Sequence, residues 1–297
     1  MTKALTYRQG VLLVLAAGFI WSLMGLLIRL VGEVSTWHVL FYRSAGMVPV
    51  LWVMLWIRSG GAPLAALRRA GWAGLAGGAC LVAAFACAIF AIQSTTVANA
   101  VFLFSATPLM SALLGRIFLG EAVRAVTWIA IAVALAGIFI MVREGLAAGA
   151  GAGNLAALAS AAAFAVFTVL TRRPEMPDAT PAILTGALLS ILAAAAMIAA
   201  AGDSFAIPLP GALIALAMGA VILGIGLSMF ALAGRVVPAA EMSLLALLEV
   251  ILGPVWVWLF LGETASAGTF AGGAIVLAAL VFNTLAGQPR PAAAPVR

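Results

Sequence analysis

The chain is a succession of apolar runs, each about as long as a membrane is thick. Ten such runs, separated by breaks rich in charge, Pro or Gly, cover 10–31, 37–57, 71–92, 97–119, 124–142, 154–172, 181–201, 210–234, 239–261 and 267–286. Hydrophobic residues make up 66% of the 297 residues and charged residues only 8%. Soluble domains carry about 25% charged residues. We therefore predict an all-α integral membrane protein with ten transmembrane helices and no soluble domain.

Several classes of protein are excluded by where the polar residues stand. The net charge of +6 comes from basic residues in short loops between apolar runs, so the bilayer surface, and not a nucleic acid, is the expected partner. Cys80 and Cys87 lie in apolar surroundings, which gives no support to a disulfide framework or a zinc site. We expect no metal and no cofactor.

Lysines and arginines predict the orientation, because they are enriched in cytoplasmic loops. With the N-terminus inside, twelve lie on the inner side: Lys3, Arg8, Arg58, Arg68, Arg69, Arg116, Arg124, Arg172, Arg173, Arg235, Arg290 and Arg297. Only Arg29 and Arg143 lie on the outer side. The run 10–31 has no small-residue cleavage motif, so we interpret it as a spanning helix. A multi-pass protein of the cell (inner) membrane with both termini cytoplasmic is expected.

An internal repeat predicts the architecture. The sequence Phe-Leu-Gly-Glu occurs at 118–121 and again at 260–263, 142 residues later. A weaker echo links 21–29 with 164–172. Each half then contains five helices, an odd number, so the second half enters the membrane upside down relative to the first. Inverted repeats of this kind are typical of secondary transporters, whose substrate site lies near the midplane between the halves.

The repeat also divides the chain. We expect a first five-helix repeat over 1–147, a second and inverted repeat over 148–287, and a disordered tail over 288–297, which is rich in Pro and Ala.

Two stretches, 95–121 and 247–254, together with Arg43, resemble the EamA-type branch of the drug/metabolite transporter superfamily. Within that branch the chain is most similar to YddG-like exporters of aromatic and neutral amino acids. The resemblance implies two five-helix halves, each with Leu-Gly-Glu at the end of its fourth helix. One departure stands out: Pro108 in the first half corresponds to Val250, and Pro254 follows four residues later. The two halves are therefore expected to bend at different depths.

Acidic residues inside a span are candidates for ion coupling. A charge in mid-membrane has a high free-energy cost, so we expect such a residue to have an interaction partner or a function. Glu249 falls midway along 239–261, and Glu241 lies near the cytoplasmic end of the same run. Glu249 either exchanges a proton during transport or fixes helix packing through a hydrogen bond. His38, the sole histidine, is a further coupling candidate, since imidazole changes charge near neutral pH; an ordinary interfacial role is the alternative.

Arg43 is the one Lys or Arg assigned to neither side of the membrane, because it lies inside the run 37–57. Its guanidinium could bind a substrate carboxylate through two hydrogen bonds. The alternative is that Arg43 pairs with a carbonyl group or an acid and fixes its own helix.

Aromatic and small polar residues share helix faces at spacings of three and four, as expected for a cavity lining or for helix packing. The candidates for substrate contact are Trp21, Ser22, Asn99, Phe102, Phe164, Thr168 and Trp256, in addition to Arg43. We expect one midplane cavity lined by the runs 10–31, 71–92, 97–119, 154–172, 210–234 and 239–261. The runs 124–142 and 267–286 are expected at the periphery.

The function predicted from these features is export of small neutral or zwitterionic solutes by alternating access. Scarce intramembrane charge argues against phosphorylated substrates, which need several bases, and the resemblance implies aromatic and other neutral amino acids. A lipophilic drug or metabolite is the alternative substrate. An intramembrane enzyme would need paired acids or clustered His, Asp and Glu, so we expect no enzyme. A monomer or weak homo-oligomer is expected, either as a proton antiporter or as a facilitator.

Overall fold

A computed structural model describes residues 5–120, 123, 125–147, 149–171, 178–234, 236–237 and 239–286, without the side chains of 145, 147, 239–241, 243 and 244. The described residues form helices and no strand. In chain order the elements are α1 (Tyr7–Ser22), α2 (Met24–Leu30), α3 (Thr36–Arg58), α4 (Pro63–Ser94), α5 (Val97–Phe104), α6 (Thr107–Leu119), α7 (Ala125–Ala147), α8 (Gly151–Leu170), α9 (Thr180–Ala201), α10 (Leu209–Ala217), η1 (Met218–Ile225), α11 (Gly226–Ala233), α12 (Ala239–Leu261) and α13 (Ala267–Ala286). The all-helical prediction is confirmed for this part of the chain.

Nine helical stretches in the described residues are long and apolar enough to cross a membrane. Three of them combine neighbouring elements: α1 with α2, α5 with α6, and α10 with η1 and α11. The tenth predicted run corresponds to α12, in which the shorter apolar stretch Leu245–Leu261 is found. Ten spans arranged as two inverted repeats stay a prediction, and the tail 288–297 lies outside the described residues.

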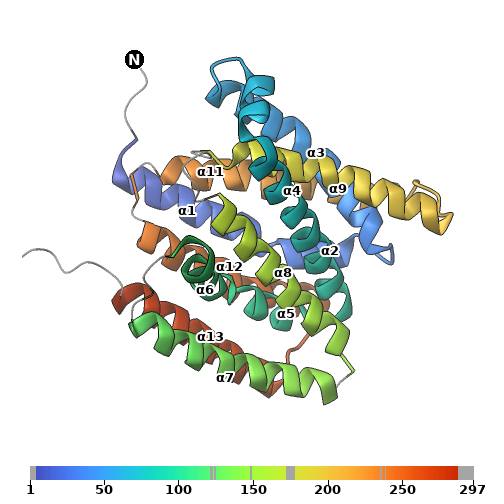
Figure 1. Cartoon of the computed structure of the whole chain (residues 1–297). Helices are drawn as coiled ribbons and strands as arrows, with labels where there is room; N and C mark the ends of the chain where they lie inside the picture. Colours follow the sequence, from blue (N-terminus) through green and yellow to red (C-terminus); the bar gives the residue numbers. More distant parts are fainter. Residues whose placement is uncertain are drawn as a thin grey trace, which may run out of the picture.

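The spans that begin or end differently from the sequence prediction do so for identifiable reasons. The helix predicted from 71 begins at Pro63, because proline fits the first helical position, where no N–H is needed. Gly71 then bends it with φ 51° and ψ −140°, a backbone conformation that glycine adopts without a Cβ clash. The result is a bent α4 (Figure 1).

Two spans of the first half are broken near their middle. The first break separates α1 from α2 at Leu23. The second separates α5 from α6, just before Pro108, whose ring cannot follow a regular helical turn. Side-chain hydroxyls satisfy the carbonyls freed there: Ser105 donates to the Phe102 oxygen at 2.6 Å and Thr107 to the Phe104 oxygen at 2.7 Å. The residues at the break therefore stabilise it.

The helices pack as a bundle with one separate pair at its edge. In Figure 1, α4 crosses beside α8 and α9, while α1 lies against α11 and α12. α3 packs on α9 and on η1. α7 and α13 lie side by side along one edge (Figure 1), where Gly137 faces the backbone of Gly272 so closely that an added Cβ would stand 2.6 Å from its oxygen.

Candidate functional site

Arg43 is the most deeply buried charged side chain of the described residues. It lies on α3 and is 1% exposed. Its Nε and Nη2 donors have no hydrogen-bond partner in the part of the chain described. The guanidinium carbon lies 4.6 Å from the ring centroid of Phe85 on α4, a cation–π contact. A buried cation with free donors and an aromatic neighbour is suited to hold a carboxylate.

The backbone around Arg43 is shaped by an unusual element, the π-helix η1. Gly219 of η1 lies directly against the carbonyl of Arg43, leaving no room for a Cβ. One turn further, the carbonyl of Ile222 accepts a hydrogen bond from Trp21 Nε1 at 2.9 Å. π-Helical turns free carbonyls for such contacts and are frequent at functional sites. η1 thus connects the α3 backbone at Arg43 with Trp21 at the end of α1.

Ser22 and Trp256 join the first half of the chain to the second. Trp256 Nε1 on α12 donates to Ser22 Oγ at 2.8 Å. Ser22 Oγ in turn donates to the Phe19 carbonyl at 2.6 Å, beside the break that ends α1. Gly253, one turn before Trp256, lets α12 approach Ser22 and Val101 of α5. The structure therefore brings Trp21, Ser22 and Trp256 into one region, at the meeting of α1, η1 and α12.

Glu249 lies on α12 one turn before Gly253, surrounded by protein but partly accessible. No hydrogen bond or ion pair to its carboxylate occurs among the described residues. The alternative role, in which Glu249 fixes helix packing through a hydrogen bond, is therefore not supported by any bond in this part of the chain. The side chain of Glu241, the other predicted acid of this helix, lies outside the described residues.

Asn99 and Phe102 face neighbouring helices. Asn99 Nδ2 donates to Thr95 Oγ1 at 3.2 Å and to Asn154 Oδ1 of α8, so that it ties α5 to α8. Phe102 packs against Gly273 of α13, where an added Cβ would strike its ring. Neither is brought together with Arg43 or the Trp21 region by the contacts found.

The remaining candidates are spread over the molecule. Phe164 is 37% exposed and packs on Phe167, while the Thr168 hydroxyl bonds within α8 to the Phe164 carbonyl. His38 is buried, with Nδ1 2.7 Å from Ser35 Oγ and Nε2 2.9 Å from the Ser204 carbonyl in the linker after α9. Both ring nitrogens are therefore engaged in contacts that fix the start of α3.

Sequence reasoning missed four residues that these contacts bring forward. Phe85 and Asn154 were indistinguishable from other residues of apolar runs. Arg29 and Glu263 form an ion pair at 3.0 Å. Both stood in repeated motifs, which was a usable signal, but their pairing depends on the fold. No group of three or more His, Cys, Asp and Glu that could hold a metal occurs among the described residues.

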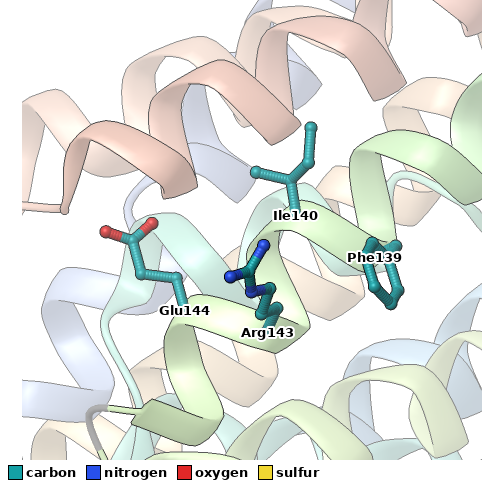
Figure 2. A pocket seen from close by; sticks show the side chains of 4 residues that line it. All are labelled: Phe139, Ile140, Arg143 and Glu144. Atoms are coloured by element: carbon teal, nitrogen blue, oxygen red, sulfur yellow. The ribbon is translucent and has the colours of Figure 1, made fainter.

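Two surface cavities lie away from these candidates. Figure 2 shows one of about 310 Å³ on α7, lined by Phe139, Ile140, Arg143 and Glu144. The other, of about 490 Å³, lies where α3 leads into α4 and is lined by Trp52, Gly61, Ala62, Pro63, Leu64, Ala65 and Arg68. Neither of the two is lined by a residue predicted to contact substrate.

Known proteins resemble this chain in part of its sequence and in its fold. A model of the EamA-like transporter family matches residues 8–143. The match supports the superfamily indicated by the sequence, and with it a multi-pass membrane transporter of small solutes. A solved crystal structure, described only as that of a protein, is 19% identical, covers 95% of this chain and 99% of its own, and superposes with a TM-score of 0.68. This likeness concerns the fold alone. No curated protein sequence matches the chain.

Proposed function

We propose that the chain is a secondary transporter that exports small neutral or zwitterionic solutes, with aromatic and other neutral amino acids foremost, by alternating access. The observation that carries the substrate class is the buried Arg43 guanidinium with its free Nε and Nη2. A carboxylate would satisfy both donors with charge-assisted hydrogen bonds. The Phe85 ring beside it offers an apolar contact to the same solute.

Helix packing supports two inverted halves. α4 packs on α8, and their repeat equivalents, the span that ends in α11 and the span that begins with α1, also pack on each other. α3 with α9, and α7 with α13, are pairs of equivalent helices. These pairings are what a pseudo-two-fold axis between the halves requires. On this proposal both termini are cytoplasmic, in the inner membrane.

Glu249 is proposed as the group that couples transport to protons or receives the solute's ammonium. Glu249 is half-buried and lies on the helix that also carries Trp256. The Trp21, Ser22 and Trp256 region beside it supplies aromatic surface. A lone carboxyl without a relay also permits a facilitator, in which the solute gradient alone drives flux.

The test is flux into proteoliposomes of phenylalanine and of two analogues that each lack one charge, phenethylamine and 3-phenylpropionate. We expect phenylalanine to be transported fastest, because only the zwitterion satisfies Arg43 and presents an ammonium. Arg43→Gln should remove that preference, whereas Arg69→Gln, which deletes an exposed guanidinium on α4, should not.

Two outcomes would contradict the proposal. Phenethylamine transported as fast as phenylalanine would show that no carboxylate is recognised, and would favour the lipophilic-solute alternative. Equal phenylalanine flux in Arg43→Gln and wild type would remove Arg43 from the solute site.

A further inference from the structure

An ionic cluster around Glu263 ties the two halves together at one end of the bundle. Glu263 lies in the linker between α12 and α13. Its Oε2 lies 3.0 Å from Arg29 Nε, and its Oε1 accepts a hydrogen bond from the Val97 N–H at 2.6 Å. Arg29 Nη2 also donates to the Thr95 carbonyl at 2.7 Å. One carboxylate of the second half thus holds the last turn of α2 and the first turn of α5.

A second set of bonds extends the cluster across the same end. Thr36 Oγ1 donates to Gln93 Oε1 at 2.6 Å, and Gln93 Nε2 donates to the Val34 carbonyl at 3.0 Å. Gln93 belongs to the last turn of α4, and Thr36 begins α3. The ends of α2 and α4 and the starts of α3 and α5 are therefore linked, and Glu263 of the second half bonds both α2 and α5.

The strength of this tie suits a contact that forms and breaks. The Arg29 and Glu263 side chains are 27% and 18% exposed, so the ion pair lies at a rim that water reaches. Partly hydrated pairs are weak and screened by salt. The bond from Val97 adds a charge-assisted contact at a helix N-terminus. Directly below, Val101 of α5 and Gly253 of α12 meet in van der Waals contact, where an added Cβ would stand 3.7 Å from Val101.

The α3 and α9 pair differs, because it is tied at both ends. At the Glu263 end, Tyr42 donates to the Phe205 carbonyl at 3.0 Å in the linker after α9. At the other end, Arg58 of α3 pairs with Asp178, just before α9, at 3.2 Å. The Arg58 and Asp178 side chains are 33% and 30% exposed, so this ion pair is no stronger than the one at Glu263. The extensive packing of α3 on α9 is what makes this pair the scaffold. The corner formed by α2, α5 and the linker after α12 is the part free to separate at this face.

We propose that the Arg29–Glu263–Val97 cluster is a gate: it holds this face of the bundle shut and opens to let solute pass. This proposal rests on the proposed function only for the identity of the solute that passes the gate. The gate is a property of the protein alone and can be measured without any solute.

The test measures how fast a membrane-impermeant maleimide labels Val101→Cys, just below the gate, after both native cysteines are replaced by Ser. A Glu33→Cys protein, whose reporter stands in the exposed linker at the same face, identifies the side from which reagent must be added. Removing the charge by Glu263→Gln should raise the labelling rate of Val101→Cys about fivefold, the effect of losing about 1 kcal/mol of coupling. The matched control Glu33→Gln deletes an exposed acid of the same face and should leave the rate unchanged.

A second measurement varies the salt concentration. Raising the salt concentration screens the rim ion pair, so labelling of Val101→Cys with Glu263 intact should speed up with salt, and the increase should vanish in Glu263→Gln. An unchanged labelling rate in folded Glu263→Gln overturns the gate. So does a salt-independent rate in the protein that keeps Glu263. Because no solute is present, these results are read separately from any failure of amino-acid transport.

Discussion

Arg43 and Glu249 are charged residues that lower the stability of the fold and are candidates for binding the solute. A charged side chain at the bilayer centre costs about 2.5–3.5 kcal/mol on insertion scales. Arg43 is offset by a Phe85 ring and not by an acid, and Glu249 has no bonded partner among the described residues. Free donors and a free acceptor inside one bundle are expensive to keep for packing alone. They fit a site whose missing partner is the solute.

The first prediction concerns Arg43. Arg43→Gln should lower phenylalanine flux by about 10- to 100-fold, the loss of about 1.5–3 kcal/mol from a hydrogen bond to a charged group. Expression and thermal unfolding should change little or improve, because the variant removes a buried charge. Flux per folded molecule and unfolding temperature in detergent measure the two effects. A large fall in unfolding temperature with unchanged flux would assign Arg43 to packing.

The second prediction separates coupling from packing at Glu249. Glu249→Gln keeps shape and hydrogen-bonding capacity but can neither bind nor release a proton. If Glu249 couples transport, the variant should keep its fold and its exchange of labelled solute, while losing any acceleration of flux by a pH gradient. Flux with and without that gradient is the measurement. A gradient effect that survives in Glu249→Gln would move the coupling role to Glu241 or His38.

For single residues, the sequence could predict which side chains are candidates for function, but not which groups they contact. Arg43 and Glu249 were recognisable because charge is rare in apolar runs. Ser22 and Trp256 are bonded to each other, and Trp21 is bonded to η1. Asn99 was predicted to contact substrate on the same grounds of spacing as these residues, but it is bonded to Asn154. Spacing of three and four defines a face of a helix, while the neighbour on that face depends on the whole fold.

Among the elements, η1 lay beyond sequence prediction. Gly219, Gly224 and Gly226 allow close contact with α3 and Trp21, but a π-helical hydrogen-bonding pattern has no distinct periodicity in an apolar run. The break before Pro108 was foreseeable from proline chemistry. The break at Leu23 was not, since the run 10–31 contains no proline. Elements are thus predictable where a residue forbids regular geometry, and otherwise depend on the neighbours.

The third prediction tests η1. Gly219→Ala should lower the unfolding temperature and the flux, because the new methyl group meets the Arg43 carbonyl and must push η1 off α3, at about 1–3 kcal/mol for overpacking. Gly18→Ala is the matched control: its methyl would stand 3.6 Å from the Leu245 carbonyl, an ordinary contact. Thermal unfolding in detergent compares them. Equal unfolding temperatures would mean that η1 shifts at no cost.

The fourth prediction concerns the tie between α5 and α8. Asn99→Leu should destabilise the protein by about 1–2 kcal/mol, since Asn154 loses its partner in an apolar surrounding. Asn154→Leu should do the same. The double variant should be less destabilised than the sum, which a double-mutant cycle on unfolding measures. Strict additivity would show that the two amides do not interact.

Over the whole molecule, nine of the ten apolar runs read from the sequence correspond, in the described residues, to helices long enough to cross a membrane, because membrane thickness fixes their length. The sequence could not predict how the halves are joined. Arg29 and Glu263 are 234 residues apart along the chain, and neither sequence motif predicts that the two side chains pair. Among the bonds found, one set holds α3 and α9 near both ends, and the set around Glu263 holds the corner of α2, α5 and α12 at one end.

The last prediction uses that contrast. If the cluster around Glu263 is the proposed gate, α5 and α12 separate during transport, whereas α7 and α13 lie at the edge and need not move apart. With the native cysteines replaced, Val101→Cys with Gly253→Cys places two thiols across α5 and α12, and Thr127→Cys with Asn283→Cys places two where hydroxyl and amide oxygens now lie 2.7 Å apart. Oxidation should form both disulfides.

Only the first disulfide should stop flux, and reduction should restore it, because that bond alone joins surfaces that part in each cycle. Non-reducing electrophoresis and flux on the same sample measure bond formation and transport together. Full flux through a protein with an intact bond between 101 and 253 would show that α5 and α12 move as one body. The opening would then have to lie elsewhere, and the scaffold assigned to α3 and α9 would become the moving part.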